Sequence, residues 1–146
     1  MERKQIFWED VQTKEDIPSS YSLKLDMTRM VHAVSGTQDF YPLHHDRDFA
    51  KESGAPDIFV MSGFILACFS RLLTDWIGDE GWVCSVKLEF RKMNLLGDTI
   101  TTKGKVINKY IQNGVHLVDT EVWMENMNFG ISVTGKATVC LPSRAE

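Results

Sequence analysis

An alternation of apolar and polar side chains predicts strands over much of the second half of the chain. In residues 84–91 every second side chain is apolar, which is typical of a strand with one face in the core: Cys84, Val86, Leu88 and Phe90. Two more strands, 99–110 and 115–125, flank Asn113-Gly114, a pair that favours a two-residue hairpin turn. The pattern predicts a final strand over 131–141.

The first part of the chain follows a different pattern, with one short strand and short helices. Residues 1–19 are polar and are expected to form an irregular leader, whereas residues 20–26 alternate in polarity like a strand. Short helices are expected over 27–34 and 47–52, because each segment is preceded by an aspartate that suits a helix N-cap, Asp26 and Asp46.

The most apolar segment, 56–77, predicts a long helix that begins at Pro56 and ends before Gly78. Residues 58–69 are apolar on nearly every side, which is typical of a buried helix. Together the elements predict one α+β domain over residues 1–146, in which a curved antiparallel sheet wraps around this helix. One sheet does not cover such a helix completely, so we expect at least a dimer.

Composition and charge exclude several classes of protein. With 43% hydrophobic and 25% charged residues, the chain is expected to fold as a globular domain. A net charge of −4 argues against nucleic acid as a partner, since phosphate binding needs a basic surface. The longest apolar run is far shorter than the ~20 residues that span a membrane, and the first ten residues lack the apolar core of a signal peptide. We therefore expect a cytoplasmic protein.

The cysteines predict neither a disulfide framework nor a zinc site, because there are three of them and no pair has the Cys-x-x-Cys spacing. Each of them lies among apolar residues: Cys68, Cys84 and Cys140. They are expected to be small core residues.

The candidate chemistry lies in residues 39–46, where two carboxylates and two imidazoles fall within eight residues. Pro42 stiffens the segment, so Asp39 and His44 are expected to stand at a fixed separation that suits general acid–base work. By spacing alone, a solvated turn is the simpler interpretation. Metal binding by His44, His45 and Asp46 is disfavoured, because neighbouring loop residues point in different directions.

Residues 39–63 resemble the motif of the MaoC-like (R)-specific enoyl-CoA hydratases, Asp-x-Asn-Pro-Ile/Leu-His-x-Asp with a later His-Gly. The matching positions, in order, are Asp39, Pro42, Leu43, His44, Asp46, Ala50, Gly54 and Gly63. Further similarity lies at 7–11, 74–76, 97–99 and 134–137, so the resemblance covers most of the chain. Residues 44–48, 57–60 and 74–76 look like a branch found in bacterial steroid and acyl-CoA degradation.

The resemblance implies a hotdog fold and a lyase that hydrates a trans-2-enoyl-CoA or dehydrates an (R)-3-hydroxyacyl-CoA. Asp39 and His44 are then the catalytic pair, which activates a water that adds to Cβ while a proton goes to Cα. Gly63 is implied to offer its backbone N–H to the thioester oxygen, at the start of the long helix. No cofactor and no metal are implied.

Two positions depart from the motif: Tyr41 replaces its Asn and Ser62 replaces the His of His-Gly. With Pro42, these two side chains are expected to shape the substrate pocket. Because one fold hosts several activities, two alternatives stay open. They are an acyl-CoA thioesterase and a non-catalytic acyl-CoA-binding subunit of a hetero-oligomeric hydratase.

Partners follow from the same resemblance. Related chains of the branch work in hetero-assemblies, some with an OB-fold protein, so the partner is a second copy, a second hotdog subunit or an OB-fold subunit. Some basic side chains are candidates for contacts with the phosphates of coenzyme A, although scattered surface charge is the simpler interpretation. These candidates are Arg47, Lys51, Arg71, Arg91 and Lys92.

Overall fold

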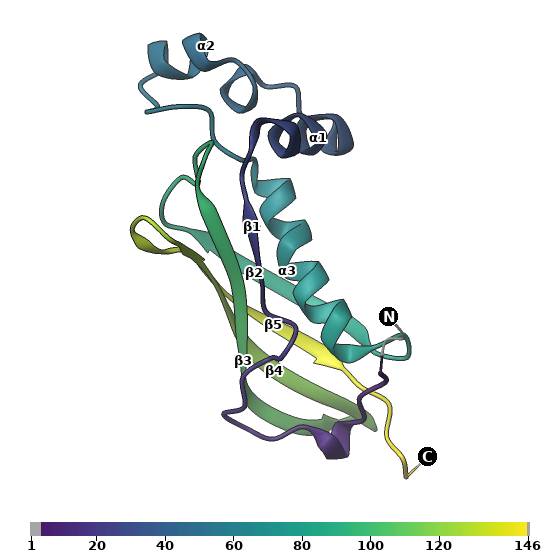
Figure 1. Ribbon diagram of the computed structural model, residues 1–146. Coiled ribbons are helices and arrows are strands. Elements are labelled where there is room, and N and C mark those ends of the chain that lie inside the picture. Colours follow the sequence, from purple (N-terminus) through teal and green to yellow (C-terminus); the bar gives the residue numbers. More distant parts are fainter. Residues whose placement is uncertain (1–3, 146) are drawn as a thin grey trace.

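A computed structural model describes residues 4–145 as one antiparallel sheet against one long helix, with a group of short helices above them (Figure 1). The helical elements are η1 (Trp8–Asp10), α1 (Met27–Thr37), η2 (Pro42–His44), α2 (Arg47–Glu52) and α3 (Ser62–Ile77). The strands are β1 (Tyr21–Lys24), β2 (Trp82–Phe90), β3 (Thr99–Gln112), β4 (Val115–Asn126) and β5 (Gly130–Cys140). The five strands follow the order β1-β3-β4-β5-β2, and the expected α+β architecture is confirmed.

The β3–β4 hairpin forms where the sequence predicts it. Asn113 and Gly114 both adopt positive φ angles, 51° and 80°, as the favoured two-residue hairpin turn requires. The two strands then pair from Gln112↔Val115 to Ile100↔Asn126, with one irregularity between Val106 and Asn108. This long hairpin is the centre of the sheet, and its inward side chains pack under α3.

Strand β2 departs from the expected alternation. A bulge between Val83 and Ser85 adds one residue to its pairing with β5, and Cys84 lies on the exposed side. Val86 and Leu88 pack against the core as expected, but Phe90 is half exposed. The prediction that all three cysteines are core residues is therefore wrong, because only Cys68 is buried.

The long helix begins at Ser62, so the prediction of a start at Pro56 is wrong. Residues 58–60 instead pair with the segment before β3: Val60 N–H donates to the Asn94 carbonyl, and Leu96 N–H donates to the Ile58 carbonyl. A short apolar run fits a strand and a helix equally well, and this long-range pairing decided the outcome.

Helix α3 is buried on one side only, which corrects the expectation of a helix enclosed all round. Its buried side chains follow helical spacing: Ile65, Cys68, Phe69, Leu72, Leu73, Trp76 and Ile77. Leu66 is 44% exposed, and Ala67 and Arg71 beside it are also exposed. The sheet therefore covers one face of α3, and the other face is open in the single chain.

Both short helices are capped as predicted. The Asp26 carboxylate accepts a hydrogen bond from Arg29 N–H, and the Asp46 carboxylate accepts from the N–H groups of Asp48 and Phe49. Helix α1 is longer than expected and continues to Thr37. This extra turn brings the chain to the candidate site.

The N-terminal segment is held to the body of the protein more firmly than its polar composition predicts. Val11 and Ile17 are buried, Trp8 N–H donates to the Pro142 carbonyl, and Arg144 makes two hydrogen bonds to Asp10. The expected domain over 1–146 also includes residues 1–3 and 146, which lie outside the described residues. None of the helices in residues 4–145 is both long and apolar enough to cross a membrane.

Candidate active site

The local fold of residues 38–46 brings Asp39 and His44 together. Helix α1 ends at Gln38, whose positive φ of 56° turns the chain so that Asp39 leaves the helix axis. Pro42 then opens the single turn η2, and His44 ends it. The Asp39 Oδ2 atom lies 3.6 Å from His44 Nε2, as expected for a pair held by a stiff segment.

The orientation of the His44 ring is set by the backbone. His44 Nδ1 lies 2.8 Å from the carbonyl oxygen of Phe59, and a carbonyl only accepts hydrogen bonds, so Nδ1 carries the hydrogen. The ring packs edge-on against the Phe59 ring, with centroids 5.1 Å apart. In the neutral ring, Nε2 therefore offers its lone pair on the side of Asp39.

The two partners differ in their access to solvent. The His44 side chain is only 9% exposed, whereas the Asp39 side chain is 44% exposed. Their 3.6 Å separation is longer than a direct hydrogen bond. It allows both atoms to reach the same water molecule at ~2.8 Å, which is the arrangement that a shared general acid–base pair requires.

His44 opens onto a cleft of about 840 Å³ between the helical segment and the loop after β2. Most of its lining is apolar and aromatic, from Phe59, Phe90 and Phe129 among others. Tyr41 and Ser62, two of the predicted pocket residues, also line it. Its polar lining includes the basic residues Arg91 and Lys92 and no Asp or Glu, as far as residues 4–145 are concerned.

The other three predicted residues, Asp39, Pro42 and Gly63, lie beside this cleft and not among its lining residues. Pro42 is half-buried and is the first residue of the turn that ends at His44. Gly63 is exposed in the first turn of α3, directly after Ser62, where N–H groups have no carbonyl one turn earlier. A Cβ at Gly63 would meet only the Thr37 side chain, at 3.5 Å.

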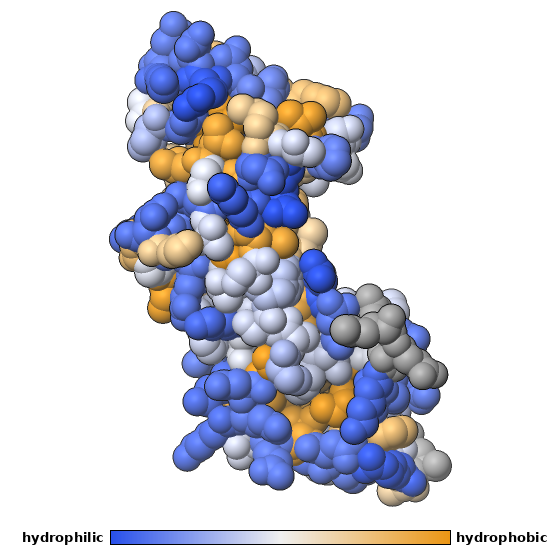
Figure 2. Space-filling view, in the orientation of Figure 1, coloured by the Kyte–Doolittle hydropathy of each residue, from blue (hydrophilic) through white to orange (hydrophobic). Residues whose placement is uncertain are grey.

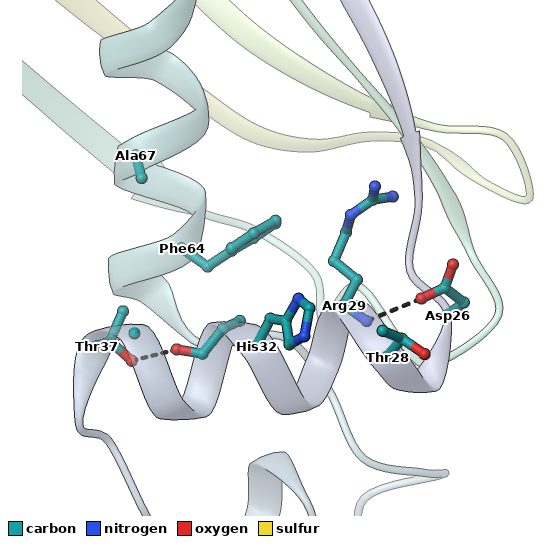
Figure 3. Close-up of a pocket in the computed structure, with 9 residues that line it drawn as sticks. Asp26, Thr28, Arg29, His32, Thr37, Phe64 and Ala67 are labelled. Carbon is teal, nitrogen blue, oxygen red and sulfur yellow. Dashed lines mark hydrogen bonds between the residues drawn. The ribbon is translucent and has the colours of Figure 1, made fainter.

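A second hollow of about 770 Å³ lies between α1 and α3, and it contains neither Asp39 nor His44 (Figure 3). Arg29 and His32 point into it from α1, opposite Phe64 and Ala67 of α3. Within residues 4–145, the titratable side chains that line this hollow are His32, Arg29 and Asp26, the last at the N-terminal end of α1. The candidate chemistry therefore stays with the cleft at His44.

The wall of the cleft opposite His44 is braced by a polar cluster that is buried except for Asn128 and that the sequence pattern did not reveal. Asp98 accepts hydrogen bonds from Leu95 N–H, from Asn126 Nδ2 and from Asn128 Nδ2, at 2.7–2.8 Å. Asn126 also donates to Asn94, which is 1% exposed and lines the cleft. We name Asn94, Asp98, Asn126 and Asn128 the amide cluster. Only the Gly97-Asp98 turn signal was visible in the sequence.

On the face of the molecule shown in Figure 2, apolar residues gather between the upper helical segment and the sheet. Several large side chains near the mouth of the cleft are strongly exposed: Phe40 at 60%, Tyr41 at 55% and Met93 at 49%. Isolated exposed apolar residues are ordinary, but a group beside a candidate site suits an apolar ligand or a partner.

Comparison with known proteins places the chain in a family. The model of the MaoC like domain matches residues 9–127, and the chain belongs to that family. A curated relative, the "3-oxo-4,17-pregnadiene-20-carboxyl-CoA hydratase beta subunit" of Mycobacterium tuberculosis, is 36% identical over 81 residues. That match covers 56% of this chain and 63% of the relative, so the chain spans less than two thirds of that protein's length.

Solved structures share the fold over nearly the whole chain. A chain of the ChsH1-ChsH2 complex of Mycobacterium tuberculosis has a TM-score of 0.80 and 29% identity, covering 90% of this chain and 98% of that one. The (R)-hydratase of A. caviae involved in PHA biosynthesis has a TM-score of 0.80 at 21% identity, covering 92% and 99%. The expected hotdog fold is confirmed by these neighbours.

Proposed function

We propose that the chain acts as a single hotdog domain over residues 1–146 that hydrates an enoyl-CoA or dehydrates a 3-hydroxyacyl-CoA. One observation carries the proposal: the Phe59 carbonyl fixes His44 so that Nε2 faces Asp39 beside an apolar cleft. Membership of the MaoC-like family and the likeness to hydratase subunits support it. The class of enzyme is a hydro-lyase, and the catalytic residues are Asp39 and His44.

In the proposed reaction one water is held between Asp39 Oδ2 and His44 Nε2. Its oxygen forms a bond to Cβ of the enoyl thioester as one of its protons passes to the pair, and a proton from the pair reaches Cα. The double bond is lost, the pair returns to its first protonation state, and no other reactant is needed. Dehydration follows the same steps in reverse.

Addition to Cβ develops negative charge on the thioester oxygen. We assign the backbone N–H of Gly63 to that oxygen, because the first N–H groups of α3 lack helical partners and carry the positive end of the helix dipole. Ser62, Tyr41 and the turn at Pro42 give the cleft its shape on the same side.

The aromatic lining suits a large apolar acyl group, and the name of the curated relative supports a bulky carboxyl-CoA. That relative is a subunit, and one solved neighbour is a two-protein complex, so a partner subunit belongs to the proposal. The partner is a second copy or another hotdog or OB-fold chain. The alternative that these names favour is a subunit that binds acyl-CoA without catalysis.

Three outcomes of one assay separate these functions. Purified protein is mixed with crotonyl-CoA and with a bulkier enoyl-CoA, and both enoyl absorbance and free thiol are followed. Hydration removes the absorbance without free thiol and supports the proposal. Release of thiol shows a thioesterase. If the thioester is unchanged, the chain alone is not a hydratase. The Asp39→Asn variant, assayed in parallel, is the matched control.

The open face of α3 predicts self-association or a partner. Leu66 and its exposed neighbours on this helix would be covered in a complex, and we expect at least a dimer at micromolar concentration. Size-exclusion chromatography with light scattering gives the mass directly. A stable 16.7 kDa monomer would contradict this prediction.

A further inference from the structure

The five basic residues that were candidates for phosphate contacts are not equivalent in the structure. Arg47 donates two hydrogen bonds to Asp57, which raise the pKa of Arg47 and lower the pKa of Asp57. Arg71 pairs with Asp75 and stacks over the Tyr21 ring. Neither of these, nor Lys51, lines the cleft at His44, which leaves Arg91 and Lys92.

Arg91 and Lys92 differ in how their charges are compensated. Arg91 forms an ion pair with Glu89 on β2, and it also borders a hollow on the outer face of the sheet. Lys92 has no carboxylate within ion-pair distance among residues 4–145, and its ammonium group lies 4.8 Å from the centre of the Phe129 ring. Lys92 therefore carries a positive charge that no carboxylate of residues 4–145 pairs with, although the protein as a whole has a net charge of −4.

The backbone under Lys92 is fixed. The N–H groups of Arg91 and Lys92 both donate to the Ser132 carbonyl of β5, at 2.8 and 3.1 Å. Phe129, in the β4–β5 turn, adds a favourable cation–ring contact to the side chain. Lys92 and Phe129 both line the cleft that also holds His44.

We propose that Lys92, supported by Phe129, binds a phosphate group of the carrier that delivers the thioester substrate. This proposal rests on the proposed function, because it places the thioester at His44 and the carrier along the same cleft. An ammonium group with no competing carboxylate among the lining residues attracts phosphate, and a phosphate is present in coenzyme A and in phosphopantetheine.

The test compares three thioesters of one enoyl acid: with N-acetylcysteamine, with phosphopantetheine and with coenzyme A. These carriers have no, one and three phosphate groups. Lys92→Gln should raise KM for the coenzyme A ester about tenfold, the worth of one charge-assisted contact, with kcat unchanged. KM for the N-acetylcysteamine ester should change less than twofold, and Lys92→Arg should restore most of the affinity.

The phosphopantetheine ester identifies the phosphate. Equal sensitivity with coenzyme A assigns the phosphate next to the pantetheine arm, and sensitivity with coenzyme A alone assigns the nucleotide phosphates. Lys87→Gln is the matched control, since Lys87 is exposed on β2, the strand that precedes Lys92, and does not line the cleft. Its KM values should match those of the unchanged protein.

Equal effects of Lys92→Gln on all three esters, or no effect on any, would overturn the proposal. Thermal melting of each variant excludes misfolding as the cause. If the unchanged protein hydrates none of the esters, the proposed function fails, and calorimetric binding of coenzyme A decides this inference separately. Coenzyme A binding that weakens about tenfold in Lys92→Gln supports the inference. Failure of the unchanged protein to bind coenzyme A, or equal binding by both proteins, overturns it.

Discussion

Two polar groups lie at the same end of α3 and have opposite characters. In the amide cluster, Asp98 is 7% exposed and both of its carboxylate oxygens accept short hydrogen bonds. The Asp39 carboxylate is 44% exposed and accepts one long bond, from Tyr41 N–H at 3.4 Å. A saturated polar group holds structure, whereas one with spare hydrogen-bonding capacity beside a cleft is available for chemistry.

The largest expected effects concern the catalytic pair. Asp39→Asn and His44→Ala should each lower kcat by about two to four orders of magnitude, the usual worth of a positioned acid–base group. The double variant should lose little more than either single variant, because the two groups act on one water. Steady-state hydration of an accepted enoyl-CoA measures this, with circular dichroism to confirm folding. Full activity in both single variants would remove the pair from the mechanism.

Substitution of Gly63 tests whether its backbone N–H stabilises the negative charge on the thioester oxygen. Gly63→Val should lower kcat about 10²–10³-fold, as loss of an oxyanion contact does, because the new side chain stands between the helix end and the thioester. Folding should persist, since a Cβ at this position meets only Thr37, at 3.5 Å. Gly63→Ala is the control for backbone conformation. Retained turnover in the valine variant would place the thioester oxygen elsewhere.

Substitution of Asp98 should lower the stability of the protein and have little effect on its catalytic rate. Asp98→Ala removes the acceptor of Leu95 N–H and of the Asn128 amide, and one of the two acceptors of the Asn126 amide. We expect the free energy of unfolding to fall by about 2–3 kcal/mol. The kcat of the folded fraction should stay within about tenfold. Denaturant titration measures the change, and Glu121→Ala, at an exposed carboxylate, should stay within ~0.5 kcal/mol. Equal stabilities would mean that the cluster is not structural.

The smallest effect is expected at His45, the neighbour of His44. His45 is exposed, and His45→Ala should keep kcat within about tenfold of the unchanged protein, a loss too small for a group that transfers protons. The assay is the one used for the catalytic pair. An inactive His45→Ala variant together with an active His44→Ala variant would reverse the assignment of the two histidines.

The sequence predicted those features that depend on neighbouring residues. The turn at Asn113-Gly114 and the caps Asp26 and Asp46 follow from local backbone preferences, and all three are confirmed. The predicted start of α3 was wrong because residues 58–60 pair with a segment more than thirty residues away, and no local pattern contains that partner. The bulge that exposes Cys84 depends on the register between β2 and β5 in the same way.

In the candidate site too, the sequence predicted the local feature and not the long-range one. The closeness of Asp39 and His44 follows from five residues of spacing around Pro42, and the structure brings the two together. The acceptor that orients His44 is a backbone carbonyl, which carries no signature in the sequence. In the sequence, Lys92 was one of five similar basic residues. The structure distinguishes it, because Arg47 and Arg71 are paired with carboxylates whereas Lys92 lies over the Phe129 ring.

The carbonyl of Phe59 has a consequence for how this protein tolerates mutation. Every residue type has a main-chain carbonyl, so no substitution at position 59 deletes the acceptor that fixes the tautomer of His44. The side chain at 59 is then free to vary with the shape of the ligand, while the ring it supports keeps its orientation. Variation among relatives at this position should therefore track substrate preference and leave the reaction type intact.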